Sequence, residues 1–314
     1  MTPTAGRRLL VVGSAAVDVV AFVPALPEQG GDVLAEASET SAAGAFNVLA
    51  AAARHGMRAG LVGRHGTGPN GDRIRGAFHA EHIELLLPPT EDGDTGFCIG
   101  LVDASGERTY VTVPGVDGSL TDDDLDGVVT DEGDVVYLSG YELAFAHGRT
   151  AARWFTALPD GVTTVFDPGP LVASLRPHLL EPVLRRATWL SLNERESHLM
   201  TGLGPAAAAQ VLLRDHPSLA GIIVRTGPDG CWLVTETDGV GRHVPVPGGP
   251  RRAVDTTGAG DCHVGTFIAS LAEGFSAVES VQRANLAAAL SVTRRGPATA
   301  PPRVQLDLGL HSSA

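Results

Sequence analysis

The residues best suited to chemistry lie in one late stretch, Asp255–Asp261, which reads DTTGAGD. Apolar residues recur at helical spacing from Val264 to Leu271, and Gly274 stands where a left-handed residue would end a helix. The stretch is therefore predicted to open a helix, where free N–H groups and the helix dipole favour an anion such as phosphate. The simpler alternative is a glycine-rich turn in which Asp261 only complements the helix dipole.

Further polar residues follow predicted strands or open predicted helices. Asn193 and Glu196 form an N-x-x-E pattern directly after a strand, which by itself is also typical of an ordinary helix cap. The segment Thr226–Gly230 has the composition of a tight turn between two strands. Gly44 permits close backbone approach, and Asn47 can both donate and accept hydrogen bonds, although an asparagine early in a helix is often a capping residue.

Three of these patterns together resemble a known family. DTTGAGD, the AGAFN stretch at 43–47 and the N-x-x-E at 193–196 are similar to signatures of the ribokinase-like carbohydrate kinases, also called the pfkB family. The resemblance extends from about Leu9 to about Pro302. It implies ATP-dependent phosphorylation of a hydroxyl group on an unphosphorylated pentose or hexose. In that family the glycine loop forms an anion hole and its last aspartate is the catalytic base.

The resemblance assigns a role to each candidate residue. The catalytic set comprises Asp261 as the base with Gly258, Ala259 and Gly260 in the anion hole, and the sugar-binding set comprises Asp18, Gly44, Asn47 and Glu142. The nucleotide would contact Asn193, Thr226, Gly227, Gly230 and Asn285, and Glu196 would hold Mg²⁺ through water. Asp255 would lie beside a monovalent cation, or could instead shape the loop as an Asx turn.

Several departures from the family pattern concern the substrate and the cation. Ala43 replaces the first glycine of the sugar motif, and Cys262-His263 replaces a small residue and an aromatic, with helix packing the favoured role for His263. Ala300 stands where a hydroxyl ligand often occurs, which leaves activation by K⁺ open.

The sequence leaves more than one class of phosphate-accepting substrate open. Asp18 favours a neutral substrate, because a carboxylate accepts hydrogen bonds from hydroxyl groups and repels a phosphate, although it could also be a solvated loop residue. A nucleoside kinase would need an aromatic slot, for which the candidates are Phe22, Phe46, Phe97 and Tyr110. A phosphosugar kinase would need basic residues, for which the candidates are Arg64 and Arg108. The third alternative is a sugar- or nucleotide-binding protein without turnover.

Composition excludes some classes of partner. The 314-residue chain has a net charge of −13, which argues against binding to nucleic acid or anionic membranes, because both attract basic surfaces. Its three cysteines are far apart and indicate a reducing compartment, and no stretch approaches the ~20 apolar residues of a membrane span. A dinucleotide fingerprint, G-x-G-x-x-G, is absent after the first strand. We expect a cytoplasmic protein that acts on small molecules.

Alternating strand and helix patterns predict an α/β fold with a mostly parallel central sheet flanked by helices. The predicted strands are Leu9–Val12, Leu61–Val62, Val135–Leu138, Thr163–Phe166, Thr188–Leu192 and Ile222–Val224, and the predicted helices include Phe46–Arg54, Pro205–His216 and one opened by a capping box at Ser276. A hairpin is expected at 97–113. We expect one domain, 1–314, and the resemblance implies a small β lid from about 15–40 and 95–115 that joins two copies as a homodimer.

Overall fold

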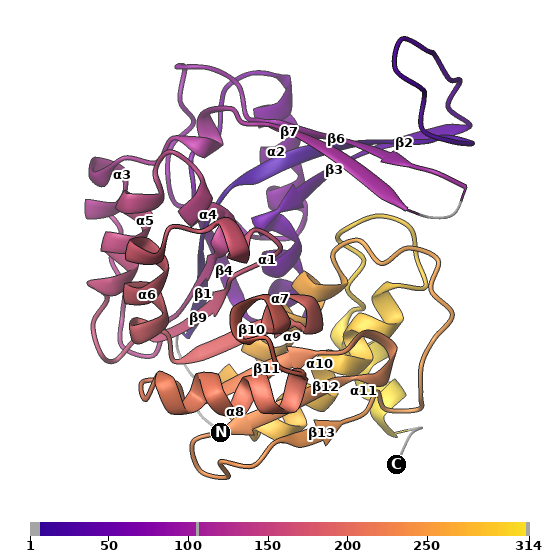
Figure 1. The fold of residues 1–314 in the computed structure, drawn as a ribbon. Helices are drawn as coiled ribbons and strands as arrows, with labels where there is room; N and C mark the ends of the chain where they lie inside the picture. The colour runs from indigo at the N-terminus through magenta and orange to yellow at the C-terminus, as the bar shows by residue number, and fades with distance from the viewer. Residues whose placement is uncertain (1–6, 105–106, 312–314) are drawn as a thin grey trace.

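The computed structural model describes residues 7–104 and 107–311 and contains two separate sheets (Figure 1). The larger sheet has nine strands in the order β13-β12-β11-β10-β9-β8-β1-β4-β5 and carries helices on both faces. The smaller sheet has four strands and projects to one side of the molecule. This arrangement confirms the predicted α/β fold with a mostly parallel central sheet.

The strands of the large sheet are β1 (Arg8–Val12), β4 (Arg58–Val62), β5 (Glu84–Leu85), β8 (Val135–Ser139), β9 (Thr163–Asp167), β10 (Trp189–Asn193), β11 (Gly221–Arg225), β12 (Cys231–Thr235) and β13 (Arg242–Val244). Six of them, β1, β4, β8, β9, β10 and β11, lie close to where the sequence predicts them. All neighbouring pairs from β11 to β5 are parallel, whereas β12 and β13 are antiparallel additions at one edge.

The central strands carry buried apolar residues on both faces because helices cover both faces of the sheet. In β1, Leu9 and Val11 face one core, whereas Leu10 and Val12 face the other. β1 pairs in parallel with β4 on one side and β8 on the other. The alternation of strand side chains therefore fixes one register for the sheet that supports the site.

The helices form the two outer layers. They are α1 (Ala45–Arg54), α2 (Pro69–Ala80), α3 (Asp122–Asp126), α4 (Gly140–Ala144), α5 (Gly148–Thr156), α6 (Pro177–Arg186), α7 (Glu194–Thr201), α8 (Pro205–Asp215), α9 (Ala259–Ala272), α10 (Ala277–Ser291) and α11 (Arg303–His311). Apolar residues of α1, α2, α9 and α10 share one core, and those of α5, α6 and α8 share the other. The predicted capping box at Ser276 is present at the start of α10.

The small sheet, called the lid below, consists of β2 (Ala15–Phe22), β3 (Ala37–Gly44), β6 (Phe97–Val102) and β7 (Arg108–Val113) in the order β3-β2-β6-β7. β6 and β7 form the predicted antiparallel hairpin. The expected turn between them includes Ser105 and Gly106, which lie outside the described residues. Because β2 runs on from β1 and β3 runs into α1, the lid is joined directly to the elements that carry the sugar motif.

The helices of the described residues are all short. The longest of them, α10, has 15 residues. None of the described helices is long and apolar enough to cross a bilayer. Cys98, Cys231 and Cys262 are all free thiols.

Candidate active site

A cavity of about 450 Å³ lies at the carboxyl ends of the parallel strands. Its floor is formed by the last residues of four strands: Ser139, Asp167, Asn193 and Arg225. Its roof is the inner face of the lid, which contributes Asp18, Cys98, Tyr110 and Thr112. The carboxyl edge of an open parallel sheet is where ligands of such folds bind, so this substrate cavity is the candidate active site.

The glycine stretch forms the N-terminus of α9, as predicted. Gly258 is the N-cap and has a φ of 70°, in the left-handed region. A Cβ atom at Gly258 would lie 2.1 Å from the Pro297 carbonyl oxygen, so only glycine fits there. Gly258, Gly260 and Asp261 line the substrate cavity, which therefore meets the amino end of a 14-residue helix. We call residues Asp255–Asp261 the anion-hole loop.

Asp261 contacts the sugar motif directly at the wall of the cavity. Asn47 on α1 donates a 2.9 Å hydrogen bond from Nδ2 to Asp261 Oδ2, which ties α1 to α9 at the site. Asn47 therefore does not cap its own helix. Burial raises the pKa of Asp261, the Asn47 hydrogen bond opposes this shift, and the nearby Asp167 adds to it.

Asp18 enters the same cavity from β2 of the lid. Burial, and after it the charge of Asp261, raises the pKa of Asp18 to about 6. The structure therefore places two acidic side chains around the space where a substrate hydroxyl would lie. Such a space suits groups that donate hydrogen bonds and disfavours an anion.

Gly44 and Glu142 shape the wall beside Asp18. Gly44 has a φ of 67°, and a Cβ atom there would lie 2.5 Å from the Ser14 carbonyl oxygen. Glu142 accepts a 2.9 Å hydrogen bond from the Ser14 N–H, and its other oxygen lies 2.7 Å from His147 Nε2. Both predicted residues line the cavity, and both also hold the chain after β1 in place.

A buried cluster of charges lies in the floor of the cavity. The Arg225 guanidinium donates to Asp167 at 2.8 Å and lies 3.7 Å from Glu196. Glu196 and Asn193 form a capping box at the start of α7, with each backbone N–H bonded to the other side chain at 2.8 Å. Burial, and after it the charge of Asp167, raises the pKa of Glu196, although Arg225 opposes this shift.

Of the predicted nucleotide residues, Thr226 alone lines a second cavity, which has a volume of about 640 Å³, whereas Asn193 lines the substrate cavity. Thr226, Pro228 and Asp229 line it from the turn between β11 and β12, in which Gly227 and Gly230 have positive φ values. Asn285 lies behind this wall, where it donates a 2.8 Å hydrogen bond to the Val244 carbonyl oxygen. Glu194 and Thr226 line this cavity, whereas the neighbouring Asn193 and Arg225 line the substrate cavity, so the two cavities adjoin.

His263 contacts neither cavity. It is buried on α9, with Nε2 3.0 Å from Asn285 Oδ1, and burial lowers its pKa to about 3. This position agrees with the favoured packing role.

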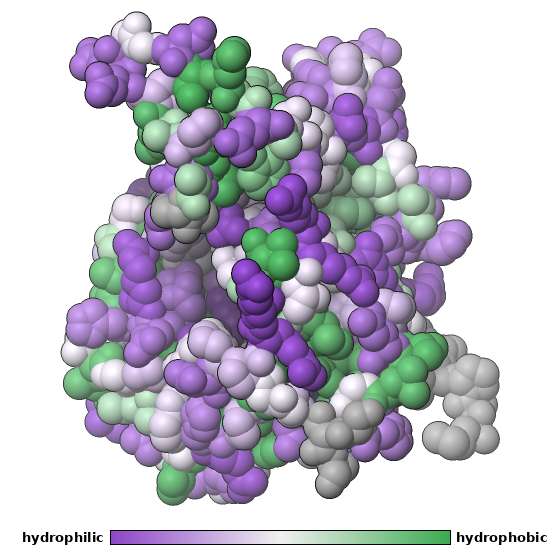
Figure 2. All heavy atoms as spheres, turned by 90° about the vertical axis from the view of Figure 1, so that its right-hand side faces the viewer, coloured by the Kyte–Doolittle hydropathy of each residue, from purple (hydrophilic) through white to green (hydrophobic). Residues whose placement is uncertain are grey.

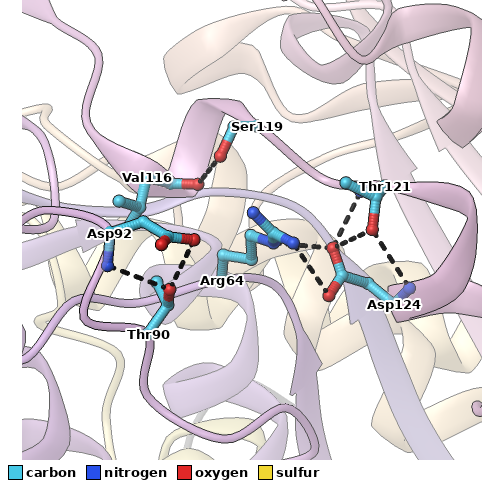
Figure 3. Close-up of polar contacts among 7 residues, drawn as sticks. All are labelled: Arg64, Thr90, Asp92, Val116, Ser119, Thr121 and Asp124. Carbon is cyan, nitrogen blue, oxygen red and sulfur yellow. Dashed lines mark hydrogen bonds and ion pairs between the residues drawn. The ribbon is translucent and has the colours of Figure 1, made fainter.

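Asp255 and the two basic candidates for a phosphosugar site are all engaged in ion pairs. Asp255 accepts a 2.9 Å hydrogen bond from the Thr257 N–H, which is the Asx turn considered above, and it also pairs with Arg108 of the lid. Arg64 pairs at 2.6 Å with Asp124 (Figure 3), and neither residue lines the substrate cavity. Neither arginine is free to bind a sugar phosphate in this structure.

Comparison with known proteins identifies the family. Residues 7–303 match the family described as pfkB family carbohydrate kinase. The chain belongs to the pfkB family of carbohydrate kinases. It is therefore a phosphotransferase, and the predicted family and enzyme class are confirmed.

Individual relatives agree with this assignment. A protein of Escherichia coli (strain K12) described as uncharacterized sugar kinase YegV is 32% identical over 307 residues, covering 96% of this chain and 94% of that protein. Ribokinase of Mus musculus is 28% identical over 306 residues, covering 94% and 91% of the two chains. The crystal structure of ribokinase from Thermotoga maritima has a TM-score of 0.81 at 24% identity, covering 98% and 100%, and so shares the fold.

Two residues of this pfkB kinase site were missed from the sequence. Asp167 and Arg225 each directly follow a predicted strand, are the last residues of β9 and β11, and lie in the cavity floor. The signal was available, because a charged residue at the carboxyl end of a buried parallel strand points to a ligand site. If Gly260 carried a Cβ atom, that atom would lie 3.7 Å from the guanidinium carbon of Arg225. This cation therefore adjoins the anion-hole loop.

The acidic side chains of this pfkB kinase fit a magnesium site completed by phosphate. Asp167 and Glu196 both line the substrate cavity, and they are the oxygen donors that Mg²⁺ prefers. No cluster of three or more His, Cys, Asp or Glu side chains suited to a metal occurs within 7–104 and 107–311. The residues present therefore fit an ion held mainly by water and substrate phosphates rather than a closed protein cage.

Proposed function

We propose that this pfkB kinase transfers the γ-phosphoryl group of ATP to a hydroxyl group of an unphosphorylated pentose or hexose. The observation that carries the proposal is the position of Asp261, which faces the substrate cavity at the start of α9 and is held by Asn47. A base, an anion-binding helix end and a roof with Asp18 meet in this one cavity. This is the set of groups that phosphoryl transfer to a neutral alcohol requires.

In this proposal, Asp261 aligns the acceptor hydroxyl and takes its proton. An aspartate is a weak base, so the proton moves late, when the acceptor oxygen has become acidic through bond formation. The N–H groups of Gly260 and Asp261 would stabilise the charge on the transferred group, whereas the Ala259 N–H already donates to the Thr256 carbonyl oxygen at 3.3 Å. Arg225 adds positive charge from the opposite side of the anion-hole loop.

ATP would occupy the second cavity and extend its phosphates into the substrate cavity. Trp232 and His243 form one wall of the second cavity, with ring centroids 5.3 Å apart, which suits the flat face of a base. Thr226, Gly227 and Gly230 would shape the site, and Asn285 would hold its wall. Bound Mg²⁺ would offset phosphate charge near Asn193 and Glu196.

A neutral sugar is favoured over a phosphosugar and over a nucleoside. Arg64 and Arg108 are both engaged in ion pairs, which argues against a phosphosugar. Of the aromatic residues expected to hold a base, Tyr110 lines the cavity, whereas Phe46 packs in the core against Phe78 at 5.2 Å. Tyr141 and Phe145 also line the cavity, and they keep a nucleoside as the second candidate acceptor.

We also infer that two copies associate through the outer face of the lid and that the enzyme works in the cytoplasm. Val19, Ile99 and Val111 lie side by side on neighbouring lid strands and are 38%, 41% and 59% exposed. Hydrophobic side chains lie among hydrophilic ones in the upper left part of the face shown in Figure 2. A second copy would remove this row from water. The free cysteines suit a reducing compartment.

The direct test is a coupled ADP-release assay with ATP and Mg²⁺ over a panel of pentoses, hexoses, keto-acid sugars, nucleosides and sugar phosphates. We expect release that depends on a neutral sugar. Turnover restricted to nucleosides would favour the second candidate, and turnover restricted to phosphosugars would contradict the role given to Asp18. No acceptor-dependent release with any compound would favour a binding protein without turnover.

A further inference from the structure

An arginine of the lid contacts the anion-hole loop from outside the catalytic groups. Arg108 begins β7, and its guanidinium reaches Asp255 and Thr256, more than a hundred residues further along the chain. Nη1 donates a 2.9 Å hydrogen bond to Thr256 Oγ1, and Nη2 pairs with Asp255 Oδ1. The side chains of Arg108 and Asp255 are only 23% and 12% exposed, so the pair is largely removed from water.

Asp255 joins two loops at the base of the site. Its Oδ1 accepts from the Thr257 N–H at 2.9 Å, and its Oδ2 accepts from the Gly296 N–H at 3.0 Å. Burial raises the pKa of Asp255, but the two backbone hydrogen bonds and the charge of Arg108 lower it by more. The pKa of Asp255 is therefore below its usual value. Asp255 is therefore an anion inside the structure, and its charge requires a nearby cation.

The fold family implies a monovalent cation beside Asp255, but the residues present do not fit a cation there. Two backbone N–H groups and one guanidinium already occupy the Asp255 carboxylate. A guanidinium is a permanent cation and blocks close approach of a second one. We propose that Arg108 is the built-in cation of the anion-hole loop, so that this kinase needs no bound K⁺.

The same contact links closure of the lid to the shape of the loop. Arg108, Tyr110 and Thr112 alternate along β7 and so share its inner face, and Tyr110 lines the substrate cavity together with Thr257 of the loop. Arg295, next to Gly296, lies with its guanidinium 5.2 Å from the ring centroid of Phe22 on β2. The Arg108 guanidinium therefore reaches Asp255 only while the lid covers the cavity. A sugar that holds the lid closed also holds the anion-hole loop in this conformation. Arg108 is a positioning residue for phosphoryl transfer.

The proposal rests on the proposed function and predicts an unusual salt dependence. Wild-type kcat should be equal, within about twofold, in KCl and in choline chloride at one ionic strength. Arg108→Gln should lose roughly tenfold or more in kcat in choline, the size of an ordinary coupling between two sites, and should regain part of it in KCl with a saturable dependence. Arg108→Lys, which keeps the charge, should stay within a few fold of wild type in both salts.

A matched control and an activity-free measurement make the test decisive. Arg185→Gln makes the same charge change at an exposed ion pair on α6 and should alter nothing. KCl should raise the melting temperature of Arg108→Gln above its value in choline chloride and leave wild type unchanged. Saturable K⁺ activation of wild type would overturn the proposal, as would an Arg108→Gln enzyme that is unaffected in choline or that does not respond to K⁺. If wild type phosphorylates no acceptor, the proposed function fails, and the melting temperatures alone decide the role of Arg108.

Discussion

At the scale of single residues, the site is a balance of buried charges. Asp18, Asp167, Glu196 and Asp261 all line one cavity, and Arg225 is the cation among them. Arg225 stays charged because Asp167 and Glu196 outweigh the effect of its burial and raise its pKa. The free enzyme therefore carries an acidic excess that a bound sugar, through its hydroxyl groups, and a bound metal would relieve.

Because acidic side chains are in excess in this cavity, we expect Asp18 to lower the stability of the free enzyme. Its pKa is raised from 3.8 to about 6, so folding works against ionisation of this carboxyl group. Each tenfold change in proton affinity corresponds to about 1.4 kcal/mol. Asp18→Asn should therefore raise the free energy of unfolding by about 2–3 kcal/mol above pH 7 and by almost nothing below pH 4. Urea unfolding across this range measures the difference.

The control for this prediction is Asp160→Asn, at an exposed aspartate. It should change stability little at any pH. A gain from Asp18→Asn that is the same at pH 4 and pH 8 would show that packing, and not charge, explains it.

Substitution of Arg225 is expected to change both the stability and the kcat of the enzyme. Arg225→Met leaves Asp167 and Glu196 without their cation in a buried floor, so we expect a loss of several kcal/mol of stability. Arg225→Lys keeps the charge but not the forked geometry, and should fold while losing kcat. Circular dichroism melting and steady-state kinetics separate the two effects, and wild-type kcat in Arg225→Lys would remove Arg225 from the proposed mechanism.

At the scale of elements, the start of α9 decides whether the anion hole exists. Gly258 and Gly260 lie two residues apart but face different surroundings. Gly258 has a left-handed φ, and the Pro297 carbonyl oxygen leaves no room for a Cβ atom. Gly260 lies within the helix, and the nearest atoms to a Cβ there belong to the Arg225 side chain, 3.7 Å away.

Alanine at these two positions gives a matched pair of variants. Gly258→Ala should lower the free energy of unfolding by about 1–2 kcal/mol from backbone strain alone, with a further loss from the contact, and should abolish activity. Gly260→Ala should fold as well as wild type, because its helical backbone accepts alanine, and should lose activity only through the methyl group in the cavity. Calorimetry with activity assays tests this order, and equal stability of the two variants would contradict the described loop.

At the scale of the whole molecule, the two faces of the lid carry different side chains. The inner face carries Asp18, Cys98 and Tyr110 toward the cavity. The outer face exposes Val19, Ile99 and Val111. Because strand side chains alternate, one sheet can bind substrate on one face and a second copy on the other.

The double variant Ile99→Glu, Val111→Glu should therefore be monomeric at concentrations where wild type is a dimer. Sedimentation velocity measures both. Val304→Glu on α11, at a valine that is 71% exposed, is the control and should leave the dimer intact. A wild-type monomer at every concentration tested would contradict the inferred role of the outer face.

The sequence predicted the fold and the start of α9 well, for identifiable reasons. Buried parallel strands such as Leu9–Val12 are continuous apolar runs, and the glycine stretch before α9 has a composition with few structural alternatives. The edge strands β5 and β13 were missed, because strands of two and three residues contain too little pattern to detect. The contact of Arg108 with Asp255 depends on how the lid folds over the loop, which local sequence does not encode.

The central claim is that Asp261 is the base for phosphoryl transfer, and Asp261→Asn tests it most directly. Asparagine keeps the size of the side chain and removes its ability to accept a proton. We expect kcat to fall roughly 10²-fold or more, with ATP binding by calorimetry unchanged and with folding intact. Turnover close to wild type in this variant would contradict the account.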